Sequence, residues 1–357
     1  MKKKIIFMPN IGFGCHCVAN DLYNEGFQVI FPIKLKKIAP LFPISRNVLN
    51  LKTNFIHMHW IEGYAGFSTK NRIGALIKSL TFIIDVYILK YLLRAKLVWT
   101  IHNLYSHECA YPKMEKVIKN FFSKKVDAII CQCKYAKKKF IKEFGAPENK
   151  IHIISHGFFK CFENQISKEK ARNHLNLRSD DLVFLFFGSI RPYKGILHLI
   201  KSFKKLSRDK NVKLLIVGKP KNNQIKKDIL NRIKNSPNIQ PMLNFIAQDQ
   251  IQIYINASDL IIFSYKKILT PGGIFLAMSF GKPVIAPRLG CIPELVNEKG
   301  AFLYNPKKPD GLLNALEEAI QNKDKLTKMG ENNFITADDL EWKRNALETK
   351  KIYEGLF

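Results

Sequence analysis

Residues 262–294, with the sequence IFSYKKILTPGGIFLAMSFGKPVIAPRLGCIPE, decide the fold that we expect for this chain. The stretch starts at the end of an apolar strand, passes a loop that ends in Pro271-Gly272-Gly273, and continues as a helix to about Phe280. An apolar strand at 284–286 and a loop at 290–294 follow. Glycines before a helix let a ligand approach the backbone, and the N–H groups of the first turn favour an anion. Because open α/β sheets bind ligands at the carboxyl ends of their strands, the stretch predicts such a sheet with an anion site, although a Gly-Gly pair alone also fits a tight turn.

The composition is that of a basic globular protein. The 357 residues suit two domains, and 58 basic and 29 acidic residues give a formal net charge of +29 that is spread along the chain. Such a charge favours anionic partners, namely a phosphorylated substrate, an acidic membrane surface or nucleic acid. A general preference for lysine in the proteins of the source organism would explain the charge equally well. The chain has no recognition-helix motif, so we expect no specific nucleic-acid partner.

We expect neither a metal nor a cofactor, because the seven cysteines lack zinc-ligand spacing and the chain has no Asp-x-Asp triplet. With no secretory signal visible, we expect a cytoplasmic protein. The most apolar run, 74–93, is interrupted by Lys78, Asp85 and Lys90, so it predicts a long half-buried helix and not a membrane span. Its apolar residues nearly encircle the helix, which leaves contact with a membrane surface open.

The first half of the chain predicts a sheet with polar side chains at the carboxyl ends of its strands. A strand at 5–8, a loop with Gly12 and Gly14, and a helix and strand up to Phe31 open a doubly wound sheet. The loop lacks the third glycine of the dinucleotide fingerprint, so we predict no nicotinamide or flavin site. The polar side chains that flank the ends of later strands are His57, His59, His102, His107, Glu108 and His156.

The alternation of strands and helices is lost at 158–178, where we place a linker. An apolar strand at 181–187 starts a second sheet, and the loop Gly188–Gly195 after it carries Arg191 and Lys194. The sequence therefore predicts two Rossmann-like, doubly wound α/β domains that face each other across a cleft. The expected bounds are 1–165 for the first domain, 166–337 for the second, and 338–357 for a final helix that packs back towards the first.

Together these segments resemble the glycosyltransferases of the GT-B fold, in particular the family 4-like enzymes of bacterial polysaccharide and glycolipid assembly. The resemblance covers nearly the whole chain. Each motif is weak by itself, but their order and spacing are together specific. The motifs are Ile56-His-Met-His-Trp60, Trp99-Thr-Ile-His-Asn103 with His107-Glu108, Ser155-His-Gly157, Phe187-Gly-Ser-Ile-Arg-Pro-Tyr-Lys-Gly195, Ala257-Ser-Asp259, Pro271-Gly-Gly273, Leu276-Ala-Met-Ser-Phe-Gly-Lys-Pro-Val284 and Gly290-Cys-Ile-Pro-Glu294.

One departure from the family pattern concerns two glutamates. The resemblance implies glutamates eight positions apart around the glycine loop, one near the donor sugar and one on the ribose, but this sequence has Ile268 and Leu276 there. An aliphatic side chain can neither accept a hydrogen bond from a ribose hydroxyl nor stabilise positive charge. In this respect the sequence is similar to a subgroup that includes β-mannosyltransferases of exopolysaccharide assembly, so retaining and inverting chemistry both stay open.

The resemblance and the charge of the leaving group together indicate a donor site in the second domain. A nucleoside diphosphate gains negative charge as the glycosidic bond breaks, so catalysis needs cations and N–H donors near it. We expect Arg191 and Lys194 to bind the diphosphate in place of a metal ion, with a solvated basic loop as the alternative. The other donor-site candidates are Gly188, Thr270, Gly272, Gly273 and Glu294. For Thr270 and Glu294, a role at a helix start is the structural alternative.

An inverting reaction needs a general base on the acceptor side, and the first domain offers candidates for it. Glu108 and His102 are the expected catalytic residues. The further acceptor-side candidates are Gly12, His59, His107 and His156. For His59 and His102, a histidine that only packs at a strand end is the structural alternative.

The expected activity is metal-independent transfer of a hexose from a GDP- or UDP-sugar to a lipid-linked or polysaccharide acceptor, with an anionic membrane surface as a further partner. A nucleotide-sugar epimerase would need carboxylates that flank the sugar, and a glycoside phosphorylase would need a lysine-anchored cofactor site that we do not find. A catalytically silent paralogue is consistent with Ile268 and Leu276. Charge alone supports a non-enzymatic polyanion binder.

Overall fold

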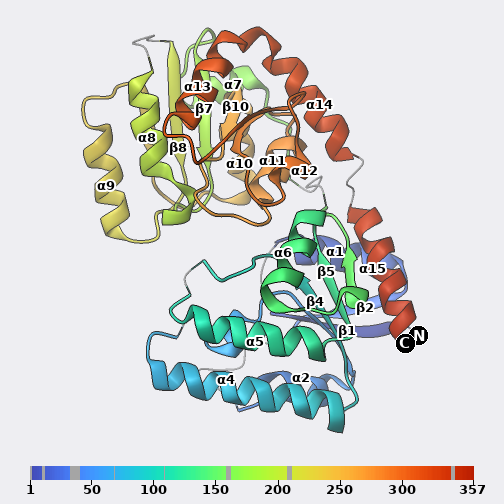
Figure 1. Ribbon diagram of the computed structural model, residues 1–357. Coiled ribbons are helices and arrows are strands. Elements are labelled where there is room, and N and C mark those ends of the chain that lie inside the picture. The colour runs from blue at the N-terminus through green and yellow to red at the C-terminus, as the bar shows by residue number, and fades with distance from the viewer. Residues whose placement is uncertain are drawn as a thin grey trace. The chain divides into compact units, whose positions relative to one another are not determined.

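The computed structural model describes residues 2–9, 13–32, 41–67, 69–107, 109–157, 162–206, 211–338 and 342–357. The chain divides into two compact units, unit 1 (Met1–Gly157 with Glu341–Phe357) and unit 2 (Phe158–Leu340), which are both seen in Figure 1. Each unit contains a six-stranded sheet whose neighbouring strands run parallel. The expected α/β class with two doubly wound domains is confirmed.

The sheet of unit 1 has the strand order β2-β1-β3-β4-β5-β6. Its strands are β1 (Lys3–Met8), β2 (Phe27–Ile30), β3 (Phe55–Met58), β4 (Lys96–Ile101), β5 (Ala128–Cys131) and β6 (Ile151–Ile153). The central strands are buried almost throughout, as expected for a parallel sheet with helices on both faces. Because β2 and β3 lie on opposite sides of β1, the winding direction reverses between β1 and β3, which is where such sheets bind ligands.

The helices of unit 1 are α1 (Phe13–Asn24), α2 (Pro43–Leu51), α3 (Glu62–Ala65), α4 (Arg72–Tyr87), α5 (Pro112–Lys125), α6 (Lys134–Phe144) and α15 (Trp342–Leu356). A π-helical turn at Ile88–Leu92 extends α4. The last helix, α15, packs against α1 (Figure 1). Tyr353 of α15 is fully buried, and its hydroxyl lies 2.6 Å from Nδ1 of His57. The end of the chain is therefore part of the core of unit 1.

The apolar run at 74–93 forms α4 and its π-helical extension, which confirms the predicted half-buried helix. Asp85 lies on the buried face and accepts hydrogen bonds from the backbone N–H groups of Ile44 (2.8 Å) and Ser45 (3.0 Å) at the start of α2. These bonds explain why a carboxylate is tolerated within an apolar run. In the described part of the chain, no helix is both long and apolar enough to cross a membrane.

The sheet of unit 2 has the strand order β12-β11-β10-β7-β8-β9. Its strands are β7 (Leu182–Phe187), β8 (Val212–Val217), β9 (Ile239–Met242), β10 (Leu260–Ile262), β11 (Val284–Pro287) and β12 (Ala301–Tyr304). Alternate residues of β7 belong to different cores: Val183 and Leu185 pack on one face of the sheet, and Phe184 and Phe186 on the other. The winding direction reverses between β7 and β10.

Helices cover both faces of this second sheet. They are α7 (Lys168–His174), α8 (Ile196–Lys205), α9 (Asn223–Ile233), α10 (Ile251–Ala257), α11 (Gly272–Ser279), α12 (Ile292–Leu295), α13 (Gly311–Gln321) and α14 (Leu326–Asp338). The expected linker at 158–178 was wrong in part, because α7 forms within it and packs against α10. Its largely polar sequence hides a short buried face of Ala171 and Arg172. Helix α14 was not predicted either.

Candidate functional site

Three loops meet at the carboxyl edge of the sheet of unit 2. They follow β7, β10 and β11, and β10 lies between the other two strands. The hydroxyl of Ser264 donates a hydrogen bond to the carbonyl of Lys194 (2.8 Å), which joins the loops after β7 and β10. The N–H of Cys291 donates to the carbonyl of Leu269 (2.8 Å), which joins the loops after β10 and β11. Because the winding of the sheet reverses between β7 and β10, this edge is the expected ligand site of unit 2.

Two glycines allow the loops to approach so closely. A Cβ atom on Gly195 would lie 2.0 Å from the carbonyl oxygen of Ser264, and one on Gly290 would lie 2.4 Å from that of Leu269. Both glycines also have positive φ angles, +72° and +55°, which side chains disfavour. The close contact between the backbones of these loops therefore requires glycine at both positions.

Arg191 and Lys194 lie together in the loop after β7, and both side chains are half-buried. The ammonium of Lys194 lies beside Gly188, since a Cβ there would be 3.0 Å from Nζ. Burial and the neighbouring Arg191 lower the pKa of Lys194 to about 8. Among the described residues, the Lys194 ammonium has no carboxylate partner. A half-buried ammonium beside a guanidinium is stabilised by a bound anion, so the two predicted residues form a candidate anion site.

The two glycines at the start of α11 differ in their surroundings. A Cβ on Gly272 would meet nothing within 4 Å, so open space lies beside the helix start. A Cβ on Gly273 would lie 2.8 Å from the ring of Phe263, so close packing alone accounts for that glycine. Among the residues that the structure describes, no side chain caps this helix. The free N–H groups of α11 therefore face space that a ligand can enter.

Thr270 and Glu294 lie at the same edge of the sheet. The alternative role of Thr270 as a helix cap is not observed: no side chain caps α11, and the Thr270 hydroxyl lies 4.0 Å from the sulfur of Cys291. Glu294 is exposed in the first turn of α12. Thr270 thus lies in the loop after β10, and Glu294 in the short helix after β11.

In unit 1, His59 and His102 meet at the carboxyl ends of the neighbouring strands β3 and β4. The Nδ1 atom of His59 lies 3.2 Å from the Nε2 atom of His102. The ring of Trp60 stacks on that of His102 with centroids 4.3 Å apart. His59 is buried, and its Nε2 atom has no hydrogen-bond partner among the described residues. A buried polar atom without a partner is uncommon, so this ring nitrogen is a candidate for a role beyond packing.

These imidazoles are held in the neutral form. Burial is the main cause that lowers the pKa of His59 and of His102 well below 6.5, and His156 is among the neighbours that lower both further. His156 itself has a pKa lowered by burial, opposed by a hydrogen bond to the carbonyl of Gly157. His59 and His102 are thus in contact, His156 is near enough to affect both electrostatically, and neutral imidazoles can accept a proton from a hydroxyl.

His57 lies in the core of unit 1, and both of its ring nitrogens have partners there. Its Nδ1 atom lies 2.6 Å from the hydroxyl of Tyr353, and its Nε2 atom lies 2.7 Å from that of Thr100. Burial, reinforced by His102, lowers the pKa of His57 to about 3. A histidine with both ring nitrogens bonded is a packing residue, so His57 is not a candidate base.

Of the remaining acceptor-side candidates, the structure describes only His107. His107 lies in the loop after β4, beyond His102. Glu108 and Gly12 lie outside the described residues. Across the described ranges, no three His, Cys, Asp or Glu side chains are grouped so that they could hold a metal ion.

A buried ion pair that sequence reasoning missed holds the loop after β4. Lys119 and Glu115 of α5 are both buried, with 2.9 Å between Nζ and Oε1. Glu115 accepts hydrogen bonds from the N–H and hydroxyl of Ser106, and Lys119 donates to the carbonyl of Leu104 (2.9 Å). Burial raises the pKa of Glu115, but Lys119 and these bonds outweigh it and hold the pKa below its ordinary value. The only sequence signal was a Glu–Lys pair four residues apart on a helix.

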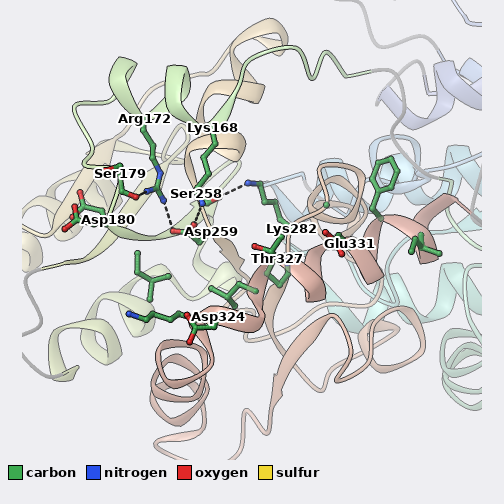
Figure 2. A pocket seen from close by; sticks show the side chains of 18 residues that line it. Lys168, Arg172, Ser179, Asp180, Ser258, Asp259, Lys282, Asp324, Thr327 and Glu331 are labelled. Carbon is green, nitrogen blue, oxygen red and sulfur yellow. Dashed lines mark hydrogen bonds and ion pairs between the residues drawn. The ribbon is translucent and has the colours of Figure 1, made fainter.

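A pocket of about 820 Å³ lies at the opposite, amino edge of the sheet of unit 2 (Figure 2). It is lined by α7, by the segments that precede β7, β10 and β11, and by α14. Nearly equal numbers of acidic and basic side chains line it, so it does not select strongly for either charge. It contains none of the predicted site residues.

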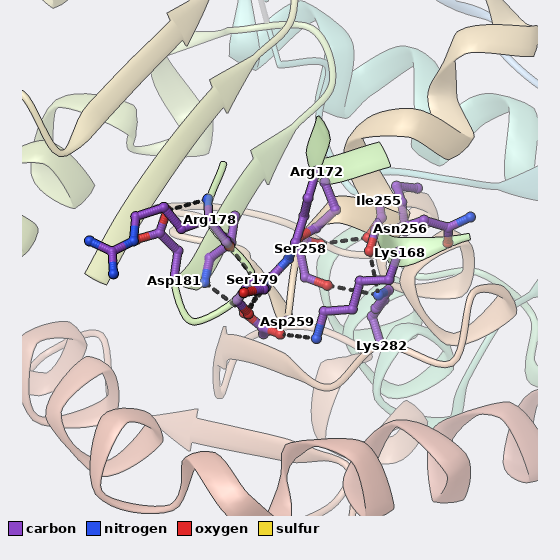
Figure 3. Close-up of polar contacts among 12 residues, drawn as sticks. Lys168, Arg172, Arg178, Ser179, Asp181, Ile255, Asn256, Ser258, Asp259 and Lys282 are labelled. Atoms are coloured by element: carbon purple, nitrogen blue, oxygen red, sulfur yellow. Dashed lines mark hydrogen bonds and ion pairs between the residues drawn. The ribbon is translucent and has the colours of Figure 1, made fainter. Parts of the chain in front are cut away.

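The polar groups of this pocket already bond to one another (Figure 3). Asp259 accepts from Arg172 (2.9 Å), Lys168 (2.6 Å) and the N–H of Val183 (2.7 Å). Lys282 donates to the carbonyl of Ser258 (2.7 Å). These bonds connect α7 to the starts of β7 and β10, so we interpret the network as one that stabilises the fold of unit 2.

Comparison with known families matches two parts of the chain. Residues 167–335 match the family described as glycosyl transferases group 1. Residues 78–158 match the family described as glycosyltransferase family 4. The first match covers the loops with Arg191, Lys194 and Gly272, and the second covers His102 and His156.

Two relatives have named activities. The lipopolysaccharide 1,2-N-acetylglucosaminetransferase of Salmonella typhimurium is 27% identical over 241 residues, which are 65% of this chain and 59% of that enzyme. The GDP-mannose:glycolipid 4-beta-D-mannosyltransferase of Xanthomonas campestris is 28% identical over 140 residues, 38% of this chain and 40% of that enzyme. The chain thus matches less than two thirds of the length of either relative.

One solved structure with the same fold is that of Anabaena HepE in complex with UDP. It superposes with a TM-score of 0.75 at 18% identity, over 99% of this chain and 100% of that one. At this identity the likeness concerns the fold.

Proposed function

Since the chain belongs to the glycosyltransferases of the GT-B fold, we propose that it transfers a hexose from a UDP- or GDP-sugar to a lipid-linked or polysaccharide acceptor. The acceptor would belong to cell-envelope polysaccharide synthesis, at the cytoplasmic face of the membrane. The named activities of the Salmonella and Xanthomonas relatives, on lipopolysaccharide and glycolipid, support this acceptor class.

The observation that carries the proposal is the pair of cations at the carboxyl edge of unit 2. The Lys194 ammonium is half-buried, lies near Arg191 and has no carboxylate partner among the described residues. Open space beside Gly272 leaves the N–H groups of α11 accessible at the same edge. A diphosphate leaving group would neutralise the cations, and its charge grows as the glycosidic bond breaks, so these groups would stabilise the transition state more than the ground state.

On the acceptor side, we assign the proton transfer to His102, with Glu108 as the other expected base. His102 is neutral at pH 7 and contacts His59, so a proton taken from the acceptor hydroxyl can be shared between the two rings. Gly12, His107 and His156 are proposed to line the acceptor side.

We propose that the reaction needs no divalent metal ion, because Arg191, Lys194 and the start of α11 supply the positive charge that a metal would bring. Thr270 and Glu294 would add a hydroxyl and a carboxylate to the donor site. Ile268 and Leu276 pack into the core of unit 2, so neither position can bind the ribose or a developing charge.

The direct test is a transfer assay with a panel of nucleotide sugars and a lipid-linked acceptor. We expect release of one nucleoside diphosphate that depends on the acceptor and is lost in a His102→Ala variant. Because Ile268 and Leu276 are aliphatic, a silent paralogue is the second candidate. It would bind a nucleoside diphosphate but release none from any donor, and that result would replace the transfer proposal.

A further inference from the structure

Helix α4 of unit 1 exposes an apolar stripe along its whole length. Its exposed apolar side chains are Ile73, Leu76, Ile77, Leu80, Ile84 and Tyr87, and the stripe continues with Tyr91 and Leu92 of the π-helical turn. Between 39% and 75% of each of these residues is exposed. Their spacing of three or four residues places them on one side of the helix. An unbroken apolar stripe of this length on a surface indicates an interaction site.

The opposite side of α4 is firmly packed, so the exposed stripe is not the result of a loosely attached helix. Ala75, Phe82, Val86 and Leu89 are buried in unit 1. Asp85 accepts hydrogen bonds from α2, as described above. The helix is therefore apolar on two sides: its inner side packs in the core of unit 1, and its outer side is exposed.

The charged residues of this segment are almost all basic. Asp85 is the single acidic residue between positions 72 and 92, and it is buried. Arg72 and Lys78 are exposed on α4, and Arg94 is exposed just after it. In the part of the chain that the structure describes, none of these three has a carboxylate partner. Exposed positive charge without a carboxylate partner thus lies on and just after the helix that carries the apolar stripe.

The neighbouring helix α5 extends the same surface. It lies beside α4 (Figure 1). Lys125 of α5 donates a hydrogen bond to the hydroxyl of Tyr91 (3.0 Å), and its ammonium lies 4.8 Å from the ring centre of Tyr87. Val117 is exposed, and the one acidic residue of α5, Glu115, is buried against Lys119. Two tyrosines with a lysine at their edge are suited to the boundary between lipid and water.

From these observations we infer that the α4 face, defined by the apolar stripe and by Arg72, Arg94 and Lys125, docks on the surface of a membrane that contains anionic phospholipids. A helix with an apolar face and flanking Lys and Arg lies in the interface between headgroups and acyl chains. Anionic headgroups attract each basic residue near the surface. A second copy of the chain fits the charge less well, because two such faces would bring like charges together.

The biological role of this docking rests on the proposed function, since a lipid-linked acceptor lies at a membrane. Vesicle binding, however, requires neither donor nor acceptor. The docking surface and the transferase activity can therefore fail separately, provided that nucleotide binding is measured on the same preparations.

The test is co-sedimentation of the full chain with vesicles of phosphatidylcholine alone or with about 30% phosphatidylglycerol. We expect binding to the anionic vesicles that weakens as salt is raised, and weak binding to the neutral ones. The variant Leu76→Glu/Leu80→Glu, which places two carboxylates in the stripe, is expected to bind anionic vesicles at least ~10-fold more weakly. Its tryptophan fluorescence and its nucleotide binding should equal those of the wild type.

The matched control is Ile335→Glu on α14 of unit 2, where the isoleucine is 66% exposed and so resembles those of the stripe. This variant should bind vesicles as the wild type does. Three results would overturn the inference: no binding of the wild type to anionic vesicles, equal binding of the wild type and the double variant, or a lipid-free dimer of the wild type that the double variant lacks. The last result would assign the α4 face to contact between two copies.

Discussion

The Nδ1 atom of His59 lies 3.2 Å from the Nε2 atom of His102, across the ends of two neighbouring parallel strands. A single proton can occupy this contact, so the protonation of each ring depends on that of the other. The remaining ring nitrogen of His59, Nε2, is buried and has no partner in the described part of the chain. We therefore propose that the pair exchanges a proton or a hydrogen bond with the acceptor substrate.

We predict that His102→Gln lowers kcat by about 10²- to 10⁴-fold, the usual contribution of a general base, with unchanged affinity for the donor nucleotide. A glutamine keeps a hydrogen-bonding side chain but cannot take up the acceptor proton. The measurement is steady-state transfer together with nucleotide binding. His152→Gln is the matched control, because His152 is exposed on the edge strand β6 of the same unit. Equal kcat for His102→Gln and the wild type would remove His102 from the mechanism.

The buried imidazoles also predict how the stability of unit 1 depends on pH. The pKa of His57 is lowered to about 3, and those of His59 and His102 are lowered well below 6.5. Below pH 6.5 the unfolded chain binds protons that the folded unit does not, so the free energy of unfolding falls as the pH falls. Each such histidine contributes about 1.4 kcal/mol per pH unit in that range.

Tryptophan fluorescence during urea unfolding measures this effect for unit 1 alone, because all three tryptophans (Trp60, Trp99 and Trp342) belong to it. We expect the urea midpoint at pH 5.5 to be clearly below that at pH 7. His57→Phe should reduce the pH dependence even though it lowers the stability itself. A midpoint that is independent of pH would contradict the neutral state of the three rings.

The ion pair between Lys119 and Glu115 predicts an asymmetric mutational result. Lys119→Met leaves the buried carboxylate without its partner and should cost about 3–5 kcal/mol in the free energy of unfolding of unit 1. The double variant Lys119→Met/Glu115→Met removes both charges and should recover a large part of that loss. The same fluorescence titration compares them. If the double variant were less stable than Lys119→Met, the ion pair would not be the source of the effect.

We predict that transfer activity survives removal of divalent metal ions. In the proposed donor site, two cationic side chains and a helix start would provide the charge, so activity in EDTA should stay within about twofold of that with Mg²⁺. The assay is release of the nucleoside diphosphate with and without chelator. A loss of tenfold or more that Mg²⁺ or Mn²⁺ restores would show that a metal ion takes part.

The sequence predicts the fold well, because long apolar strands and glycine loops are local signals. The segment around Gly272 and the strand before Gly188 define the second sheet, and the apolar run at 74–93 predicts a helix. What the sequence hides are short elements with few apolar residues. Helix α7 is an example, since its position depends on the bonds from Arg172 and Lys168 to Asp259, which lies about 90 residues further along the chain.

The candidate site was predicted in part for the same reason. Residues at the carboxyl ends of neighbouring parallel strands must lie close together, and this places His59 near His102 and Lys194 near Ser264. Spacing alone does not separate His57, which is bonded on both ring nitrogens, from His59, which is not. The buried pair of Lys119 and Glu115 also has no signature beyond an ordinary helix-surface pattern. These distinctions depend on tertiary contacts between distant parts of the chain.

The most direct test of the central claim is calorimetric binding of UDP, GDP, ADP and CMP to the wild type, to Lys194→Ala and to Lys201→Ala. We predict saturable binding of one nucleoside diphosphate, weakened by about 10- to 100-fold in Lys194→Ala, because a hydrogen-bonded charge is lost. Lys201 is exposed on α8, so its variant should bind like the wild type. No binding across the panel, or equal affinity of Lys194→Ala and the wild type, would contradict a donor site at the carboxyl edge of unit 2.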